Sequence, residues 1–184
     1  LHRTSSGRPS PAIASALSAR PLFQLPFPCG QKWRASTYFK HPTYGDHTGI
    51  DWNRADDGGD EVVAAAGGTA TTGSSAKGGY FVLIDHGGGW STYYGHLQND
   101  GRVAGPVRQG AMIGYVGHSG TAAEGDHLHF EQRSSRGWET PQYANGRALS
   151  PGTTYTNSDP WYTSANCAPP VMAAPKVAVS GDGA

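Results

Sequence analysis

Short apolar runs separated by glycine-rich stretches recur along the chain from about residue 60. Residues 61–72 (EVVAAAGGTATT) are small and β-branched, and residues 78–97 (GGYFVLIDHGGGWSTYYGHL) hold two apolar, aromatic runs. Such composition is typical of strands, so residues 78–97 predict two strands joined by a glycine-rich turn at 86–89. Residues 111–117 (AMIGYVG) and 127–133 (HLHFEQR) predict further strands. Because no long window shows helical periodicity, we expect a mainly β, antiparallel fold with little helix.

Composition narrows the class of protein. The chain has 184 residues, enough for one domain with a sizeable core, and 27 glycines and 13 prolines indicate many loops. Five Trp, nine Tyr and five Phe supply apolar surface for that core. Lys and Arg together number 14 and so do Asp and Glu, which argues against a nucleic-acid partner. No apolar run approaches the roughly 18 residues of a membrane span, so we expect no membrane association. We also expect a monomer.

The two ends of the chain differ in composition from the middle. Residues 1–20 are rich in Ser, Pro, Ala and Arg and predict a linker or a processed leader remnant. Residues 168–184 (APPVMAAPKVAVSGDGA) predict a flexible tail. We therefore place one folded domain at residues 21–167.

The chain's two cysteines, Cys29 and Cys167, lie near the two ends of this predicted domain. Neither belongs to a C-x-x-C pair, which disfavours a cysteine-based zinc site. We expect a disulfide between them, and with it an oxidising, extracellular setting. Two unpaired buried thiols are the alternative.

Residues 126–130 read DHLHF. In a strand, His127 and His129 project from one face while Leu128 and Phe130 point to the other. Two neutral imidazoles on one face are able to ligate a metal ion, or one ligates while the other transfers protons. Because eight histidines produce such a pair by chance, a metal site needs a third partner.

Residues 45–51 (GDHTGID) supply that partner. His47 and Asp51 are four positions apart and share one side of either a strand or a helical turn. With one histidine of the 127/129 pair, they form two imidazoles and a carboxylate. Such a set, with a fourth position left to water, is what a catalytic zinc ion requires, and it predicts one zinc. Alone, His47 and Asp51 are typical of a solvated polar loop.

A third histidine, His96, ends the aromatic stretch at 91–97 (STYYGHL). The chain has no HExxH motif, so a histidine left over from metal ligation must activate water. Taken alone, His96 is equally typical of a hydrogen-bonded core histidine. The phenols of Tyr38 and Tyr44 are candidate oxyanion donors, although tyrosines at such positions more often pack.

HTGID, YYGHL and GDHLHF together resemble the three signature stretches of the lysostaphin and LytM-type zinc endopeptidases of bacterial cell walls. The similarity runs in the same order over residues 21–134. LFQLPFPCGQKW and GGWSTYYGHL are also similar to the β-lytic and staphylolytic branch. The resemblance implies an antiparallel β-sheet groove flanked by loops. It implies the zinc ligands His47, Asp51 and His129, and the catalytic histidines His96 and His127.

Three positions bear on how this chain departs from the family pattern. The family often has proline before the histidine pair, whereas Asp126 stands here and is able to hydrogen-bond a nearby histidine. In the β-lytic branch the first zinc histidine lies further upstream of its aspartate, so His41 is the alternative to His47. His118 falls in an expected wall of the groove and is a candidate substrate contact.

Together these features predict a secreted zinc metalloendopeptidase, a hydrolase that lyses bacterial cell walls, with its catalytic domain at residues 21–167. Its partners would be the peptide stems and cross-bridges of peptidoglycan, cut at Gly- or D-Ala-containing bonds, a preference that rests on the family alone. A catalytically inactive LytM-like module that binds the wall or a partner is the alternative. A structural metal-binding protein without turnover is a third hypothesis. Because all five polar positions are filled, we favour the enzyme.

Overall fold

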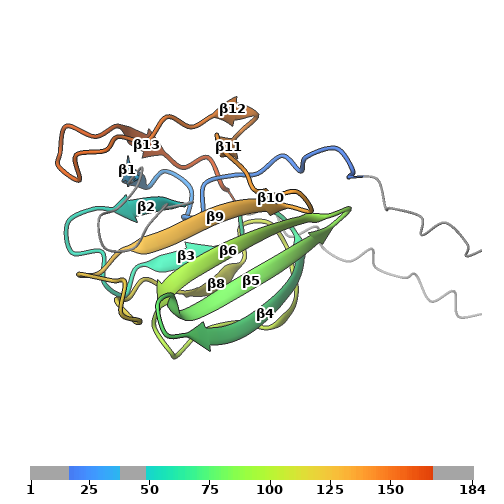
Figure 1. The fold of residues 1–184 in the computed structure, drawn as a ribbon, viewed down its shortest axis with the longest axis horizontal. Coiled ribbons are helices and arrows are strands. Elements are labelled where there is room, and N and C mark those ends of the chain that lie inside the picture. Colours follow the sequence, from blue (N-terminus) through green and yellow to red (C-terminus); the bar gives the residue numbers. More distant parts are fainter. Residues whose placement is uncertain (1–16, 38–48, 168–184) are drawn as a thin grey trace, which may run out of the picture.

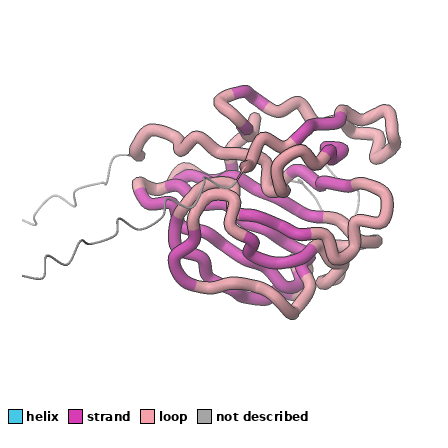
Figure 2. Tube along the Cα trace, turned by 180° about the vertical axis from the view of Figure 1, so that it is seen from behind, coloured by secondary structure: helices cyan, strands magenta, loops and turns pink. Residues whose placement is uncertain are grey.

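The computed structural model describes residues 17–37 and 49–167, which form strands, turns and loops and contain no helix (Figure 2). This confirms the expected mainly β, antiparallel class. The strands are β1 (Lys32–Ser36), β2 (Ile50–Asn53), β3 (Glu61–Val63), β4 (Gly68–Ser75), β5 (Gly79–Gly87), β6 (Trp90–Leu97), β7 (Gly105–Val107), β8 (Met112–Tyr115), β9 (Leu128–Ser134), β10 (Gly137–Trp138), β11 (Tyr143–Ala144), β12 (Arg147–Ala148) and β13 (Trp161–Thr163).

One nine-stranded sheet dominates the molecule (Figure 1). Its order is β13-β1-β2-β9-β6-β5-β4-β7, with β10 paired to β9, and the paired strands run antiparallel. Two small sheets accompany it, β3 with β8 and β11 with β12. Strands that are distant in sequence therefore meet at the centre, where β9 lies between β2 and β6.

The predicted turn between the two longest runs is present. β5 ends at Gly87 and β6 begins at Trp90, and Gly87, Gly88 and Gly89 all have positive φ angles of 76°, 59° and 85°. This left-handed backbone is accessible to glycine without a steric penalty, which explains the run of three glycines. In this hairpin Leu83 pairs with Tyr93, and its strand β6 lies next to β9 in the sheet.

Alternation along the central strands gives the sheet an apolar face and a polar face. Leu128 and Phe130 of β9 are buried, as are Trp52 of β2 and Tyr94 of β6. The small β3–β8 sheet, which lies behind the large sheet in Figure 1, contributes Val62 and other apolar side chains to the same core. Side chains at the intervening positions of β9 and β2 project from the opposite face.

Both ends of the described chain are tied to this core. Phe27 is fully buried and stacks on Trp33, with ring centroids 3.7 Å apart. Cys29 forms a disulfide with Cys167 across 138 residues, which confirms the predicted pairing. Leu17, in the segment expected to be a linker, packs against the core. Residues 1–16 and 168–184 lie outside the described residues.

Candidate active site

Two predicted ligands meet on the polar face of the sheet. Asp51 of β2 pairs directly with His129 of β9. Nδ1 of His129 lies 3.0 Å from Oδ1 of Asp51. Gly49 lies close to the same ring, because a Cβ at Gly49 would come within 2.6 Å of Cε1 of His129. An imidazole and a carboxylate, brought together from strands 78 residues apart in sequence, thus form one donor pair.

His127 lies beside this pair, just before β9 begins. Its Nε2 is 3.7 Å from Oδ1 of Asp51, and its Nδ1 is 2.9 Å from the carbonyl oxygen of Gly125. Because a carbonyl only accepts hydrogen bonds, Nδ1 of His127 is the donor. In the neutral ring, Nε2 therefore has no proton and faces the Asp51–His129 pair.

His96 reaches the same place through an irregular backbone. In β6, Thr92 and Tyr94 point into the core, so regular alternation would also bury the side chain of His96 on that side. Instead, His96 has a φ of +62°, a left-handed conformation uncommon for a residue with a side chain. Its ring consequently lies 4.7 Å from that of His127 and 5.8 Å from that of His129, measured between centroids.

The tautomer of His96 is set in the same way as that of His127. Nδ1 of His96 donates to the carbonyl oxygen of Ser119 at 2.8 Å, which leaves Nε2 without a proton in the neutral ring. Burial, followed by the neighbouring His127, lowers the pKa of His96 to about 4. His96 is therefore neutral at neutral pH and able to accept a proton.

His129 presents the opposite arrangement. Its Nε2 lies 2.8 Å from Oε1 of Glu131 and its Nδ1 faces Asp51, so both ring nitrogens point at carboxylates. Burial works against the charge, but the hydrogen bonds to Asp51 and Glu131 raise the pKa of His129 to about 9. To ligate a metal ion at Nδ1, this ring would have to lose the proton there, because only unprotonated nitrogen ligates.

The donor chemistry of this pair fits zinc, which binds histidine nitrogen and aspartate oxygen. Within residues 17–37 and 49–167 no group of three or more His, Cys, Asp or Glu side chains is able to hold a metal ion. Asp51 and His129, two of the three predicted ligands, thus contact each other directly. The third, His47, and its alternative His41 lie outside the described residues, as do Tyr38 and Tyr44.

The remaining predicted residue, His118, lies at a pocket beside the three histidines. Its Nδ1 is 2.8 Å from Oδ1 of Asp126, so Asp126 does pair with a nearby histidine. The pocket has a volume of about 430 Å³ and is also lined by Tyr80 and Ser119. Ser119 connects the pocket to the site, because its carbonyl accepts the hydrogen bond from His96.

Two residues of this site were not identified from the sequence. The hydroxyl of Tyr155 donates to Oδ2 of Asp51 at 2.9 Å, across 104 residues. Glu131 contacts the far side of His129. Alternation in HLHFEQR places Glu131 on the face of His129, a signal that was present in the sequence. Tyr155 lies in a loop, and its distance along the chain left no local signal.

A carboxylate–imidazole donor pair flanked by two histidines, at the centre of an antiparallel sheet, defines the kind of site found in metal-dependent hydrolases. Residues 45–151 match the profile described as Peptidase family M23. This match covers more than half of the chain, and the protein belongs to that peptidase family.

A curated relative is similar in sequence, and solved structures share the fold. The chain is 43% identical over 99 residues to the DD-carboxypeptidase/endopeptidase Mpg of Neisseria meningitidis serogroup B, covering 52% of this chain and 23% of Mpg. It thus spans about a quarter of the length of that relative. The fold is similar to pseudoalterin, described as a novel M23 metalloprotease from the deep sea (TM-score 0.58, 22% identity, 75% of this chain and 87% of that one). It is also similar to a zinc-containing peptidase from Vibrio cholerae (TM-score 0.53, 24% identity, 70% and 41%).

Proposed function

We propose that this protein is a secreted zinc endopeptidase that hydrolyses peptide cross-links of bacterial peptidoglycan. One observation supports this most directly. The rings of His96 and His127, both held at Nδ1 by backbone carbonyls, lie beside the Asp51–His129 donor pair. The family assignment supports peptidase chemistry at these residues. A binding module without activity has no need of two further histidines next to a donor pair.

The protein's own side chains have distinct tasks in this proposal. Asp51 and His129, with His47, would hold a zinc ion, which when bound polarises a carbonyl and lowers the pKa of water. His127 accepts a proton at Nε2 and delivers it to the departing amine. His96 stays neutral, because its pKa is about 4, and offers its unprotonated Nε2 to a proton of the attacking water.

The substrate class is proposed from the family and from Mpg. Mpg is named a DD-carboxypeptidase/endopeptidase, and this name supports a substrate whose cleaved peptide bond contains a D-amino acid such as D-Ala. The pocket lined by His118 and Tyr80 offers space for a neighbouring part of the stem.

The extracellular setting is supported by the disulfide between Cys29 and Cys167, because such bonds persist in oxidising compartments. Within residues 17–37 and 49–167 there is no helix long and apolar enough to cross a membrane. We further propose that the domain acts as a monomer.

The decisive experiment is digestion of purified peptidoglycan of known cross-bridge, with mass spectrometry of the released fragments. We expect new amino termini at D-Ala- or Gly-containing bonds, loss of release with a chelator, and recovery with zinc. The His127→Ala variant serves as the matched control for contaminating hydrolases. Binding to walls without any released fragment, in protein shown to contain zinc, would instead favour the inactive module.

A further inference from the structure

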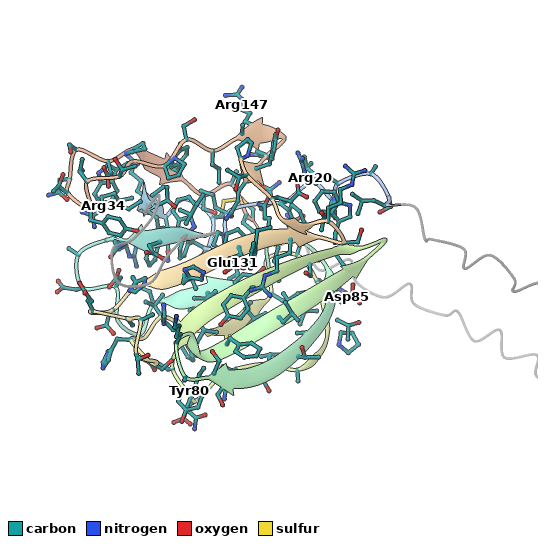
Figure 3. The ribbon with its side chains drawn as sticks, viewed as in Figure 1. Arg20, Arg34, Tyr80, Asp85, Glu131 and Arg147 are labelled. Atoms are coloured by element: carbon teal, nitrogen blue, oxygen red, sulfur yellow. A yellow bond between two sulfur atoms is a disulfide. The ribbon has the colours of Figure 1, made fainter. Side chains whose placement is uncertain are left out.

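Glu131 is a buried carboxylate on the polar face of the sheet. It lies on β9 two positions beyond His129, near the middle of the sheet in Figure 3. Its side chain is 7% exposed and that of His129 is 13% exposed. A charge at such a depth is costly unless hydrogen-bonding partners compensate for the lost water.

Each carboxylate oxygen of Glu131 has a specific partner. Oε1 accepts a hydrogen bond from Nε2 of His129 at 2.8 Å, and Oε2 accepts one from Nε of Arg133 at 2.6 Å. The guanidinium of Arg133 in turn lies over the ring of Tyr93, with 4.6 Å between Cζ and the ring centroid. Tyr93, Arg133, Glu131 and His129 thus form one chain of contacts along β6 and β9, which ends at Asp51.

The orientation of His129 separates Glu131 from the ligand position. Nδ1 of the ring faces Asp51 and Nε2 faces Glu131, so the imidazole lies between the two carboxylates. Glu131 consequently acts on the opposite nitrogen from the one that meets the metal. His127 and His96 differ in this respect, because backbone carbonyls hold their Nδ1 protons.

We propose that Glu131, held by Arg133, is the positioning residue that keeps a proton on Nε2 of His129 and so makes Nδ1 the metal-binding atom. This inference rests on the proposed zinc-dependent function. A carboxylate hydrogen-bonded to a ligand histidine fixes the ring's tautomer and orientation and increases its basicity. Arg133 supplies the compensating charge and, through its contact with Tyr93, fixes the carboxylate's direction.

The test measures zinc affinity on the full chain rather than activity. Competition with a chromogenic chelator gives the zinc dissociation constant for the wild type and for Glu131→Gln. We expect Glu131→Gln to bind zinc about 10–100-fold more weakly, the usual effect of removing such a partner. Arg133→Met keeps the packing on Tyr93 and should weaken binding in the same direction by a smaller factor. Glu139→Gln removes the same charge from an ion pair with Arg20 and should leave affinity unchanged.

A spectroscopic measurement separates positioning from general stability. In the zinc-loaded wild type, the Nε2 proton of His129 should give a slowly exchanging NMR resonance, and Glu131→Gln should shift or remove it. A Glu131→Gln protein with wild-type affinity and an unchanged resonance would refute the inference, while wall digestion by the wild type would still stand. If the wild type itself retains no zinc in the competition, the proposed function and this inference both fail.

Discussion

At the scale of single residues, His127 and His129 lie two positions apart but are held in opposite ways. A backbone carbonyl accepts the Nδ1 proton of His127, whereas a carboxylate accepts the Nε2 proton of His129. The histidine pair therefore offers two different nitrogens toward Asp51. This difference is the physical basis for assigning one ring to the metal and the other to proton transfer.

Alanine variants of the two histidines should therefore fail differently. His129→Ala removes a proposed zinc ligand, so we expect it to lose both zinc and activity. His127→Ala and His96→Ala leave the donor pair intact and should retain zinc, while turnover falls by ~10²–10⁴-fold, the usual contribution of a general acid or base. Metal analysis beside wall digestion measures both. A zinc-free His127→Ala protein with a zinc-loaded His129→Ala protein would reverse the two assignments.

The histidine at the end of β5 allows a pH prediction away from the site. Nδ1 and Nε2 of His86 lie 2.8 Å from the oxygen of Gly67 and from Oγ1 of Thr92. Burial lowers the pKa of His86 below its ordinary value of 6.5. As the pH falls, His86 is therefore protonated in the unfolded chain before it is protonated in the folded chain. His86 thus lowers the free energy of unfolding below about pH 6.5 and leaves it unchanged above that pH.

His86→Gln should flatten that dependence. We expect the urea midpoint of the wild type to fall between pH 7.5 and pH 5, and the variant to show a shallower slope over the same range. Both proteins are compared at equal, saturating zinc so that metal binding does not differ between them. Identical slopes would show that His86 is not among the groups responsible.

At the scale of elements, the strands were predictable where short apolar and aromatic runs are separated by glycine-rich stretches. The runs at 78–97, 111–117 and 127–133 all contain strands, and the glycine turn lies where three glycines occur together. β1 and β13 were not predicted from the sequence, because each is short and pairs with a segment distant in sequence. The alternation of side chains between the two faces of a strand does not hold at His96, because its positive φ directs the ring away from the core face.

Contacts between residues distant in sequence also limit how much of the site is predictable from the sequence. Asp51, His96, His127 and His129 were recognisable because they fall in motifs that resemble those of a known family. Tyr155 was not, because its hydroxyl reaches Asp51 only through the loop that follows β12. The roles of His47, His41, Tyr38 and Tyr44 stay predictions.

Asp159 is a buried polar anchor of that loop. Asp159 accepts hydrogen bonds from the hydroxyls of Ser36 and Thr154 at 2.8 and 2.6 Å and from the backbone N–H of Tyr155 at 2.7 Å. Tyr155 itself has a φ of +55°, a strained conformation that the surrounding contacts must maintain. The position of the Tyr155 hydroxyl on Asp51 therefore depends on Asp159.

Asp159→Ala should loosen this loop while the sheet stays folded. We expect the amide of Tyr155 to lose protection from hydrogen exchange and the free energy of unfolding to fall by about 1–3 kcal/mol, because the buried hydroxyl of Ser36 loses its acceptor. Ser158→Ala is the matched control, since Ser158 contacts only exposed hydroxyls in the same loop. Equal exchange rates in both variants would argue against an anchoring role for Asp159.

At the scale of the whole molecule, the disulfide closes a loop of 138 residues. In the chain-entropy model, such a closure destabilises the unfolded state by about 5 kcal/mol, and measured effects are often smaller. The Cys29→Ser/Cys167→Ser double variant should therefore unfold at a lower denaturant concentration than the oxidised wild type. Titration of the unfolded, unreduced wild type should find no thiol. Two reactive thiols, or an unchanged midpoint, would contradict a stabilising cross-link.

The strand order also determines when the site comes into existence. β4, β5 and β6 pair with their neighbours in sequence, so this meander is able to form early. Asp51 meets His129 only when β2 has docked on β9, a contact between segments made far apart in time during synthesis. An incomplete or partly folded chain therefore has no assembled donor pair. In the proposed peptidase, the donor pair would therefore exist only after folding has reached the centre of the sheet.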